Sequence, residues 1–348
     1  MNSVQNIPRV SVLLPVHNGE PYLREAVESV LNQTFPDFEL VVINDGSTDR
    51  TGEILETYSD PRIRRLNNPQ CLGLIKTLNR GLREVRGEYI ARMDADDICL
   101  PRRLAIQLRY MDRHPQVGVL GGQVIGFGKE AQGRSRRYTD HDDIVANMIF
   151  YASIHHPTVM MRTALLRKYH LAYDEAYAHC EDRDLWVRAA QCFKLANLDQ
   201  VVLYYRKHGG SVSWRHYETQ RRNGDRVIRR ILEGLGLNPT EAELKLHRAH
   251  LPFENITPEN FLAAQEAWLS RLLFQNRKLN RFNRKSLEKI VHQRWYSLCL
   301  TNSAGVPGLM FQYARSSLAR GPVRCKAFNL LKLFSRSMVK SLRPENVP

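Results

Sequence analysis

The chain lacks paired cysteines, a long apolar run and an amino-terminal export signal. Its six cysteines are scattered, without a C-x-x-C pair or the spacing of zinc ligands, which excludes a disulfide framework and indicates reduced thiols. No run of about 18 uncharged apolar residues is present, so we expect no membrane-spanning helix. The first residues also lack the basic and apolar segments of a signal peptide. We therefore expect a cytoplasmic protein.

Acidic residues are scarce near the carboxyl terminus. Of the net charge of +15 over 348 residues, residues 277–348 contribute +13, from 15 Lys and Arg against two Glu. In residues 327–342, taken as a helix, the apolar side chains share one face, and Lys332, Arg336 and Lys340 lie opposite. This pattern is typical of a helix at a membrane surface, so we expect peripheral contact with the anionic inner face of the cell membrane. A tail helix packed on its own domain is the alternative.

Apolar runs and amphipathic segments alternate through the first half of the chain. Near-continuous apolar runs at residues 10–16 and 39–43 predict buried parallel strands. Shorter strands are expected at residues 63–66, 89–93, 117–122 and 201–205, with helices at 22–31, 48–58, 72–85 and 101–113. Such alternation predicts a mostly parallel α/β sheet flanked by helices, with ligands beyond the carboxyl ends of the strands.

The length favours two parts, because a single hydrophobic core stops growing near about 250–300 residues. We expect an α/β domain over residues 1–215 and a mainly helical, basic region over residues 216–348, with helices at 257–274 and 285–298. Residues 125–140 contain several Gly and Arg without periodicity and predict a mobile loop.

Three carboxylates occur in the four residues Asp94-Ala95-Asp96-Asp97, directly after an apolar strand. Alone this string is weak, since loops and helix starts often contain it. After a buried strand of a β-α-β series it predicts a site for Mn²⁺ or Mg²⁺, with Asp96 and Asp94 as ligands, because both ions prefer oxygen donors. Such an ion neutralises the negative charge of a diphosphate leaving group.

Two further acidic positions could contact a nucleotide base or accept a proton. Asp45 follows the strand at 39–43 and can accept a hydrogen bond from the imide N–H of uracil or thymine; an Asx turn or a cap for the helix at 48–58 is the alternative. Glu181 and Asp182 open a helix expected at 181–192, where the amino terminus would keep a carboxylate ionised and able to take a proton from a hydroxyl. Simple capping acids are the alternative there.

The order of these strings over residues 9–215 resembles family 2 glycosyltransferases of the GT-A fold, a bacterial group that builds surface polysaccharides. The strings include Pro-Val-His-Asn-Gly-Glu, Asn-Asp-Gly-Ser-Thr-Asp, Arg-Met-Asp-Ala-Asp-Asp, His-Pro-Thr-Val-Met-Met-Arg and Glu-Asp-Arg-Asp-Leu-Trp. The resemblance implies an inverting, metal-dependent enzyme. It would move one sugar from a nucleotide-sugar, UDP- or dTDP-linked, to a hydroxyl of a saccharide or lipid-linked acceptor, in the synthesis of O-antigen, capsule or exopolysaccharide.

The resemblance also implies roles for particular residues. Pro15 and Asp45 would contact the base, Asp94 the nucleoside, Asp96 the metal, and Asp182, beside Glu181, would be the general base. The remaining donor-binding positions implied are His17, Asn18, Glu20, Asn67 or Asn68, Lys76, and the diphosphate contacts Arg206, His208 and Ser211. Relatives often carry Arg where this chain has Lys76.

Two other classes of protein fit less of the sequence. A nucleic-acid-binding protein would explain the basic region but none of the acidic strings, so we expect no nucleic acid partner. A nucleotidyltransferase on a related sheet would need a Gly-rich basic loop near the amino terminus, and residues 15–20 contain no Lys or Arg. Processive family members carry Gln-x-x-Arg-Trp and membrane spans; this chain has Gln293-Arg294-Trp295 without that spacing, which indicates addition of a single sugar.

Overall fold

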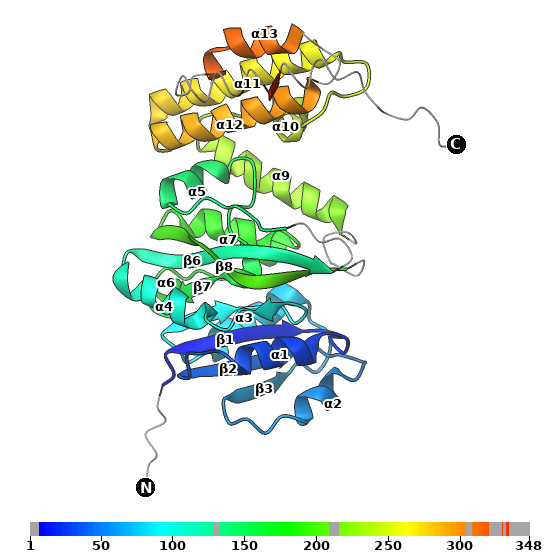
Figure 1. Ribbon diagram of the computed structural model, residues 1–348, viewed down its shortest axis with the longest axis vertical. Helices are drawn as coiled ribbons and strands as arrows, with labels where there is room; N and C mark the ends of the chain where they lie inside the picture. Colours follow the sequence, from blue (N-terminus) through cyan, green and yellow to red (C-terminus); the bar gives the residue numbers. More distant parts are fainter. Residues whose placement is uncertain are drawn as a thin grey trace, which may run out of the picture. The chain divides into compact units, whose positions relative to one another are not determined.

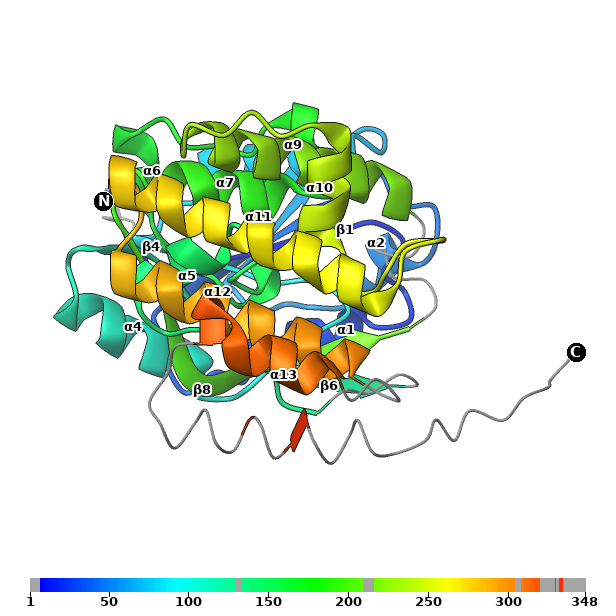
Figure 2. The same ribbon diagram turned by 90° about the horizontal axis from the view of Figure 1, so that it is seen from above.

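The computed structural model describes residues 7–128, 133–208, 216–303, 308–319, 329 and 332–333. The chain divides into two compact units. The first comprises Met1–Met148 and Ala152–Gly224, and the second Ile149–Tyr151 and Asp225–Pro348. The boundary lies inside helix α9 (Tyr217–Glu233), which is labelled in Figures 1 and 2.

The first unit is built on an eight-stranded sheet in the order β3-β2-β1-β4-β7-β6-β8-β5. The strands are β1 (Val10–Val16), β2 (Phe38–Asn44), β3 (Ile63–Asn67), β4 (Tyr89–Arg92), β5 (Ile98–Cys99), β6 (Val117–Gly128), β7 (Met160–Arg162) and β8 (Lys194–Lys207). Strands β3, β2, β1 and β4 run parallel, as do β6 and β8, whereas β7 is antiparallel to β4 and β6, and β5 to β8. The predicted α/β fold with a mostly parallel sheet is confirmed.

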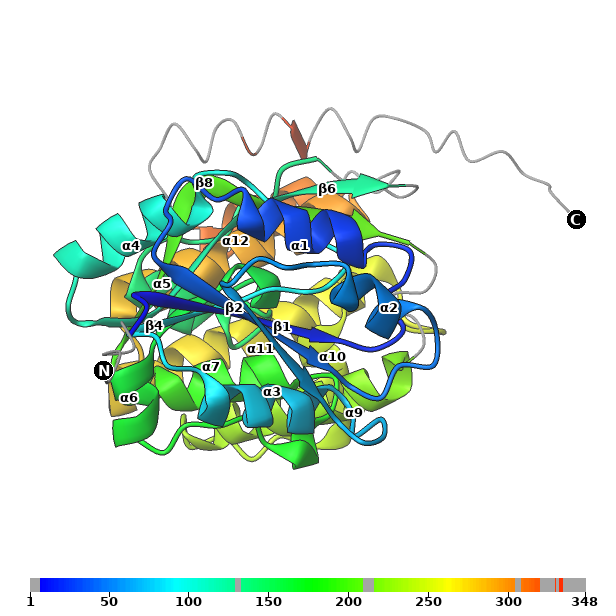
Figure 3. The same cartoon turned by 90° about the horizontal axis from the view of Figure 1, so that it is seen from below.

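Helices cover both faces of this sheet because side chains alternate along its strands. The helices are α1 (Leu23–Leu31), α2 (Thr51–Glu56), α3 (Leu74–Glu84), α4 (Arg103–Arg113), α5 (His141–Asn147), α6 (Thr163–Lys168) and α7 (Glu181–Ala189), with short 3-10 turns η1 (His156–Thr158) and η2 (Glu175–Tyr177). Val12 and Leu14 of β1 pack with α1, α2 and α4, whereas Leu13 packs with α3 on the other face. Figure 3 shows α1 and α3 on opposite sides of the strands.

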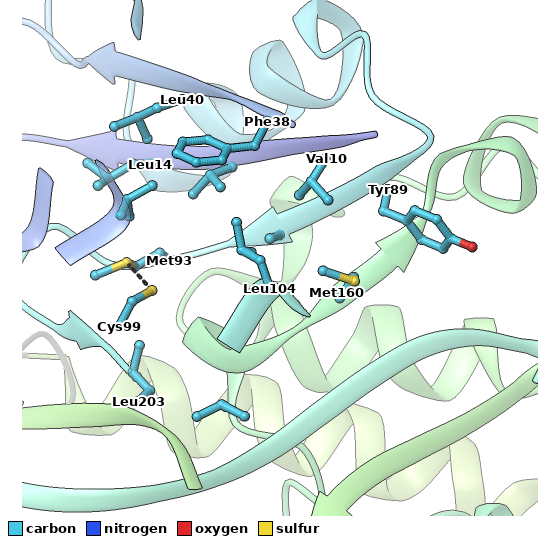
Figure 4. Close-up of a cluster of buried hydrophobic side chains, with 14 of the residues drawn as sticks. Val10, Leu14, Phe38, Leu40, Tyr89, Met93, Cys99, Leu104, Met160 and Leu203 are labelled. Carbon is cyan, nitrogen blue, oxygen red and sulfur yellow. Dashed lines mark hydrogen bonds between the residues drawn. The ribbon is translucent and has the colours of Figure 1, made fainter. Parts of the chain in front are cut away.

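The first of these two cores extends under the acidic string. Val10, Leu14 and Leu40 of the parallel strands are buried there with Met93 and Cys99, which flank residues 94–97 (Figure 4). The Cys99 Sγ lies 3.1 Å from the Met93 Sδ. Apolar packing on both sides of the acidic string therefore fixes its ends.

The second unit is helical. Its helices are α10 (Glu241–Arg248), α11 (Pro258–Leu279), α12 (Arg284–Asn302) and α13 (Gly308–Arg315), followed by the 3-10 turn η3 (Ser317–Ala319). Thr257 caps α11 ahead of Pro258, which suits a first turn, and α11 ends at Asn280 with a left-handed φ of 48°. Asn283 then caps α12 by accepting from the Ser286 N–H at 3.2 Å. No helix within the described ranges combines the length and the apolar composition that crossing a bilayer requires.

Three local expectations were wrong or incomplete. Residues 125–128 continue β6 rather than forming a loop, because they pair with β8 as far as Lys207. The helix expected at 48–58 is shorter: α2 begins at Thr51 and ends at Glu56, and its N-cap Arg50 makes no side-chain capping hydrogen bond. Helices α9, α10 and α13 and strand β5 were not predicted. Of the helix expected at 327–342, only Asn329, Lys332 and Leu333 belong to the described residues, so that expectation lies outside them.

Candidate active site

Three carboxylates converge where β4 ends. Oxygens of Asp94, Asp96 and Asp97 all lie within 4.8 Å of one another. Asp97 is 1% exposed; its Oδ1 accepts the Arg206 N–H at 2.9 Å, whereas its buried Oδ2 has no hydrogen-bond partner among the residues that the structure describes. Burial, together with the charges of Asp94 and Asp96, raises the pKa of Asp97 well above its ordinary value. A divalent cation would offset this repulsion, so the residues fit Mg²⁺ or Mn²⁺.

His208 directly follows β8 and joins this cluster. Its Nε2 lies 3.0 Å from the Asp96 Oδ2. The pairing of β8 with β5 brings it there, since β5 begins one residue after Asp97. Burial and the charge of Asp94 raise the pKa of Asp96, and the hydrogen bond with His208 opposes them. The imidazole therefore stands beside a candidate metal ligand and is itself a candidate nitrogen ligand.

Arg206, two residues before His208, makes several contacts within the protein. Its Nε donates to the Asp96 carbonyl at 2.7 Å and its guanidinium donates to Glu25 at 2.6 Å. The guanidinium carbon also lies 4.5 Å and 4.4 Å from the ring centroids of Tyr22 and Phe127. These contacts immobilise the end of β8 against the acidic cluster. Ser211, the third expected diphosphate contact, lies outside the described residues.

Asp45, after β2, organises the segment that leads into α3. Its Oδ1 accepts from Asn68 Nδ2 at 2.6 Å and the Leu72 N–H at 2.9 Å, and its Oδ2 accepts the Gly73 N–H at 2.9 Å. Burial acts to raise the pKa of Asp45, but these hydrogen bonds outweigh it and the pKa is lowered. The carboxylate is thus ionised and preorganised. It does not cap the helix at 48–58, so that alternative is wrong.

The two Asn candidates after β3 differ in accessibility. Asn68 is 4% exposed and bonds Asp45, the Thr77 hydroxyl at 2.9 Å and the Arg80 guanidinium at 2.5 Å. Asn67 is exposed at the end of β3. Lys76 is exposed on α3, and its Nζ lies 3.7 Å from Glu175. The structure therefore leaves Asn67 and Lys76 open to a ligand and uses Asn68 to support Asp45.

The loop after β1 is tied to the loop after β2. The Asn18 N–H donates to the Ser47 Oγ at 2.9 Å, and the Asn18 Oδ1 accepts the Thr48 N–H at 2.8 Å. The other residues of this loop that are predicted to bind the nucleotide-sugar also contact β2 or the loop after it. Glu20 accepts the Arg50 N–H at 3.2 Å, and the His17 Nδ1 lies 2.8 Å from the Asp45 carbonyl. Pro15 is buried opposite Ile43. The structure thus ties His17, Asn18 and Glu20 to the loop at residues 45–50.

Gly46 is required where these loops meet the segment before α3. Its φ is +62°, and a Cβ built on it would lie 2.4 Å from the backbone nitrogen of Cys71. We expect Gly46→Ala to destabilise the protein by about 2–4 kcal/mol, from left-handed strain and overpacking. Gly224→Ala is the matched control, since nothing lies within 4 Å of its Cβ position. Urea unfolding checks both, and equal midpoints would contradict the argument.

The proton-transfer candidates begin α7. Asp182 is half-buried, and its Oδ1 accepts the Arg183 N–H at 2.6 Å. Burial raises the pKa of Asp182 despite that bond and the charges of Arg92 and Arg183. The helix amino terminus therefore does not keep this pKa low, contrary to the expectation from the sequence. A raised pKa makes the Asp182 carboxylate a stronger general base.

Arg92 connects the acidic cluster to α7, and sequence reasoning missed it. It is 1% exposed and forms a two-point ion pair with Asp94, at 2.6 Å and 2.5 Å. Its positive charge also acts on Glu181 and Asp182, where it opposes the rise in pKa that burial causes. The available signal was a charged residue in an otherwise apolar strand, because a buried charge is retained only when it is paired.

Two histidines before β7 were also missed. The His156 Nε2 lies 2.8 Å from the Tyr173 hydroxyl, and burial together with Arg92 holds the pKa of His156 well below its ordinary value. The Arg137 Nε lies 3.1 Å from the His155 Nε2, and burial with that charge lowers the pKa of His155 to about 3. Both imidazoles are therefore neutral at pH 7, and Arg137 also experiences the charge of Asp182.

Glu181 carries a stability prediction. It is 7% exposed, and within the described part of the chain its Oε2 has no hydrogen-bond partner. Burial with the Asp182 charge raises its pKa from 4.5 to about 7. The folded state thus holds this proton more tightly than the unfolded state, so wild-type stability falls as pH rises from about 4.5 through 7. We expect Glu181→Gln to stabilise the protein on the order of 1–3 kcal/mol at pH 8 and less at pH 5.

Urea unfolding at the two pH values measures this difference. Glu259→Gln, on an exposed position of α11, is the control for loss of one negative charge. A Glu181→Gln gain that is the same at both pH values would show that the Glu181 carboxyl is not protonated in the folded wild type.

Comparison with known proteins identifies the family of the chain. Residues 11–171 match the family model described as glycosyl transferase family 2. An uncharacterized glycosyltransferase of Haemophilus influenzae is 34% identical over 238 residues, which cover 65% of this chain and 74% of the relative. The putative glycosyltransferase EpsE of Bacillus subtilis is 31% identical over 216 residues, covering 60% and 77%.

Solved structures share the fold. Residues 1–349 of S. aureus TarS, crystallised with UDP-GlcNAc, match with a TM-score of 0.55 and 22% identity, covering 94% of this chain and 90% of that one. A longer TarS chain matches with a TM-score of 0.53, and there this chain covers 55% of it. The GT-A type of sheet expected from the sequence is thereby confirmed. With the identity and coverage of the Haemophilus relative, these matches show that the chain belongs to glycosyl transferase family 2 and is a glycosyltransferase.

Proposed function

We propose that the protein is an inverting, metal-dependent glycosyltransferase that moves one sugar from a UDP- or dTDP-sugar to an acceptor hydroxyl. The observation that carries the proposal is that one buried side chain, Arg92, interacts with both groups of acidic residues, the candidate metal cluster and the carboxylates of α7. Arg92 pairs with Asp94 of the candidate metal cluster, and its charge also acts on Asp182, the candidate base. A donor held at the first group would therefore lie near a base at the second.

In the proposed reaction Asp182 accepts the proton of the acceptor hydroxyl while the oxygen attacks the anomeric carbon. The bond from that carbon to the diphosphate oxygen breaks on the opposite face, and its electron pair leaves with the nucleoside diphosphate. Asp96 and Asp94 would hold the metal, with Asp97 and His208 as further donors. The metal, when bound, supplies positive charge to the departing diphosphate. Asp182 and Glu181 provide the carboxylates for proton transfer.

We place the nucleoside at the connected loops after β1, β2 and β3. Asp45 is ionised and fixed, and Pro15 pairs in the sheet with Ile43, two residues before it. His17, Asn18, Glu20 and Asn67 border the same loops, and Lys76 supplies an exposed cation on α3. Binding of UDP-GlcNAc by TarS makes uridine nucleotides the first to test here.

The acceptor and the setting follow from the relatives and from charge. We propose a saccharide or lipid-linked acceptor in cell-surface polysaccharide synthesis, with residues 1–215 as the transferase domain. The basic region 216–348 would contact an anionic inner membrane, consistent with a net charge of +13 over residues 277–348. Membership of the family favours this function over a nucleic-acid-binding protein or a nucleotidyltransferase.

Thermal unfolding tests the proposal directly. We expect UDP or dTDP to raise the melting temperature in the presence of Mn²⁺ or Mg²⁺, and GDP and CDP to raise it less, because a ligand stabilises the state it binds. A shift with no metal requirement would contradict a metal-bound diphosphate. Absence of a shift with all four nucleotides would contradict the donor assignment.

A further inference from the structure

The helical unit contains a cavity of about 760 Å³ between α11 and α12, bordered by η3 and Asn329. The two helices lie side by side (Figure 2). Leu273, Phe274 and Arg277 of α11 recur at helical spacing, so one face of that helix lines the cavity. The volume lies in the range of small-molecule sites, about 300–1,000 Å³.

One end of the cavity is basic. Its cationic lining residues are Arg277, Arg284, Lys285 and Lys289. Glu288 is the one acid among the described lining residues, and it contacts Arg277 at 3.3 Å and Arg284 at 3.2 Å. The contact from Arg277 to Glu288 shows that the end of α11 lies next to the start of α12. The cations therefore gather near the connection at 280–283 with an excess of positive charge.

The rest of the lining mixes apolar and polar side chains. Leu273 and Phe274 of α11, Tyr296 of α12 and Leu318 of η3 supply apolar surface, beside Ser270, His292, Gln293, Ser317 and Asn329. Phe274 is 54% exposed, an unusual position for a large apolar side chain beside a cavity. Because α11 and α12 are connected by a short turn and run in opposite directions, Leu273 and Tyr296 lie farther from the turn than the cations do, and Phe274 lies level with Lys289.

We infer that this cavity binds a single anionic lipid, with its phosphate at the basic end and its hydrocarbon chain along Leu273, Phe274 and Tyr296. Charge complementarity selects this occupant. The chain's own segment at 327–342 already contributes Asn329 to the lining, and it carries Lys332, Arg336 and Lys340 and no acid, so it adds no negative charge to the cavity. A free phosphate would leave the apolar part of the lining unused. The inference deepens the proposed membrane contact, on which it rests, by giving it a defined lipid site.

The test uses the full chain with short-chain phosphatidic acid below its micelle concentration, read by thermal unfolding. Phosphatidylcholine vesicles with and without phosphatidic acid provide a second reading by co-sedimentation. We expect Lys285→Glu and Phe274→Ser each to weaken lipid binding at least about fivefold. Lys245→Glu, a cation of α10 that does not line the cavity, should change it less than twofold, a difference that bulk surface charge does not produce.

Three results would overturn the inference. Equal weakening by Lys285→Glu and Lys245→Glu would assign the binding to general surface charge. An equal thermal shift with glycerol 3-phosphate would show that the hydrocarbon chain is not bound, and no effect of Phe274→Ser would show the same. The UDP-induced shift is measured in every variant: its persistence shows correct folding. A lipid shift without any UDP shift in the wild type would refute the donor proposal and leave the lipid site standing.

Discussion

Asp182→Asn should lower kcat by about 10³-fold while leaving nucleotide affinity unchanged within about twofold, since a positioned general base contributes about 10²–10⁴-fold. Asn keeps the shape of the side chain and can still accept the Arg183 N–H, but it cannot take a proton. Because burial raises the pKa of Asp182, the wild-type rate should fall as pH drops and this carboxylate becomes protonated. Single-turnover sugar transfer measures the rate, and UDP titration measures the affinity.

Asp199→Asn is the control for this substitution, because Asp199 is 85% exposed and pairs with Arg134 at the surface. It should leave both kcat and UDP affinity unchanged. If Asp182→Asn reduced transfer and UDP binding to the same extent, the side chain would be a donor ligand and the base would have to be sought elsewhere, with Glu181 the next candidate.

Asp96→Asn should abolish the metal-dependent part of nucleotide stabilisation. At a nucleotide concentration of 100 times Kd, that stabilisation is about 2.7 kcal/mol in the wild type. The variant without ligand should be at least as stable as the wild type, because one of three crowded carboxylates has lost its charge. Melting temperatures with and without UDP and Mn²⁺ give both quantities.

The opposite signs of these two effects separate a lost ligand from a damaged fold. A variant that lost stability in the absence of ligand would show that Asp96 serves the fold through His208 and not a metal. Asp199→Asn again provides the control, with an unchanged response to UDP and Mn²⁺.

The buried elements of the fold could be predicted from the sequence because burial leaves a direct pattern. The run at residues 10–16 matches β1 to the residue, and the helix expected at 101–113 is α4 without its first two residues. Strand β6 could not be followed beyond Gly122 since its glycines carry no apolar signal. They pack closely instead: a Cβ on Gly122 would lie 2.7 Å from Val202. Strand β5 has only two residues, too few for any periodicity.

The site was predictable where acids follow strands and was missed where distant segments meet. Asp94, Asp96 and Asp182 are marked by their local strings, but the contact of His208 with Asp96 spans 112 residues and depends on how β8 pairs. Asp45 was assigned to a nucleotide base, and in the fold its carboxylate also accepts hydrogen bonds from Asn68, the Cys71 thiol and two backbone N–H groups. Sequence spacing could not reveal those internal bonds, because they follow from the path of the chain before α3.

Arg92 lies on β4, where the parallel strands give way to antiparallel β7. Its pairing with Asp94 and its influence on Glu181 and Asp182 place one cation between two titrating centres. Thermodynamic linkage then requires reciprocity: positive charge arriving at Asp94 lowers the proton affinity of the α7 carboxylates, and protons taken up there weaken cation binding by the same free energy. In the proposed reaction, binding of the donor with its metal and deprotonation of the acceptor hydroxyl are therefore coupled through the charge of Arg92.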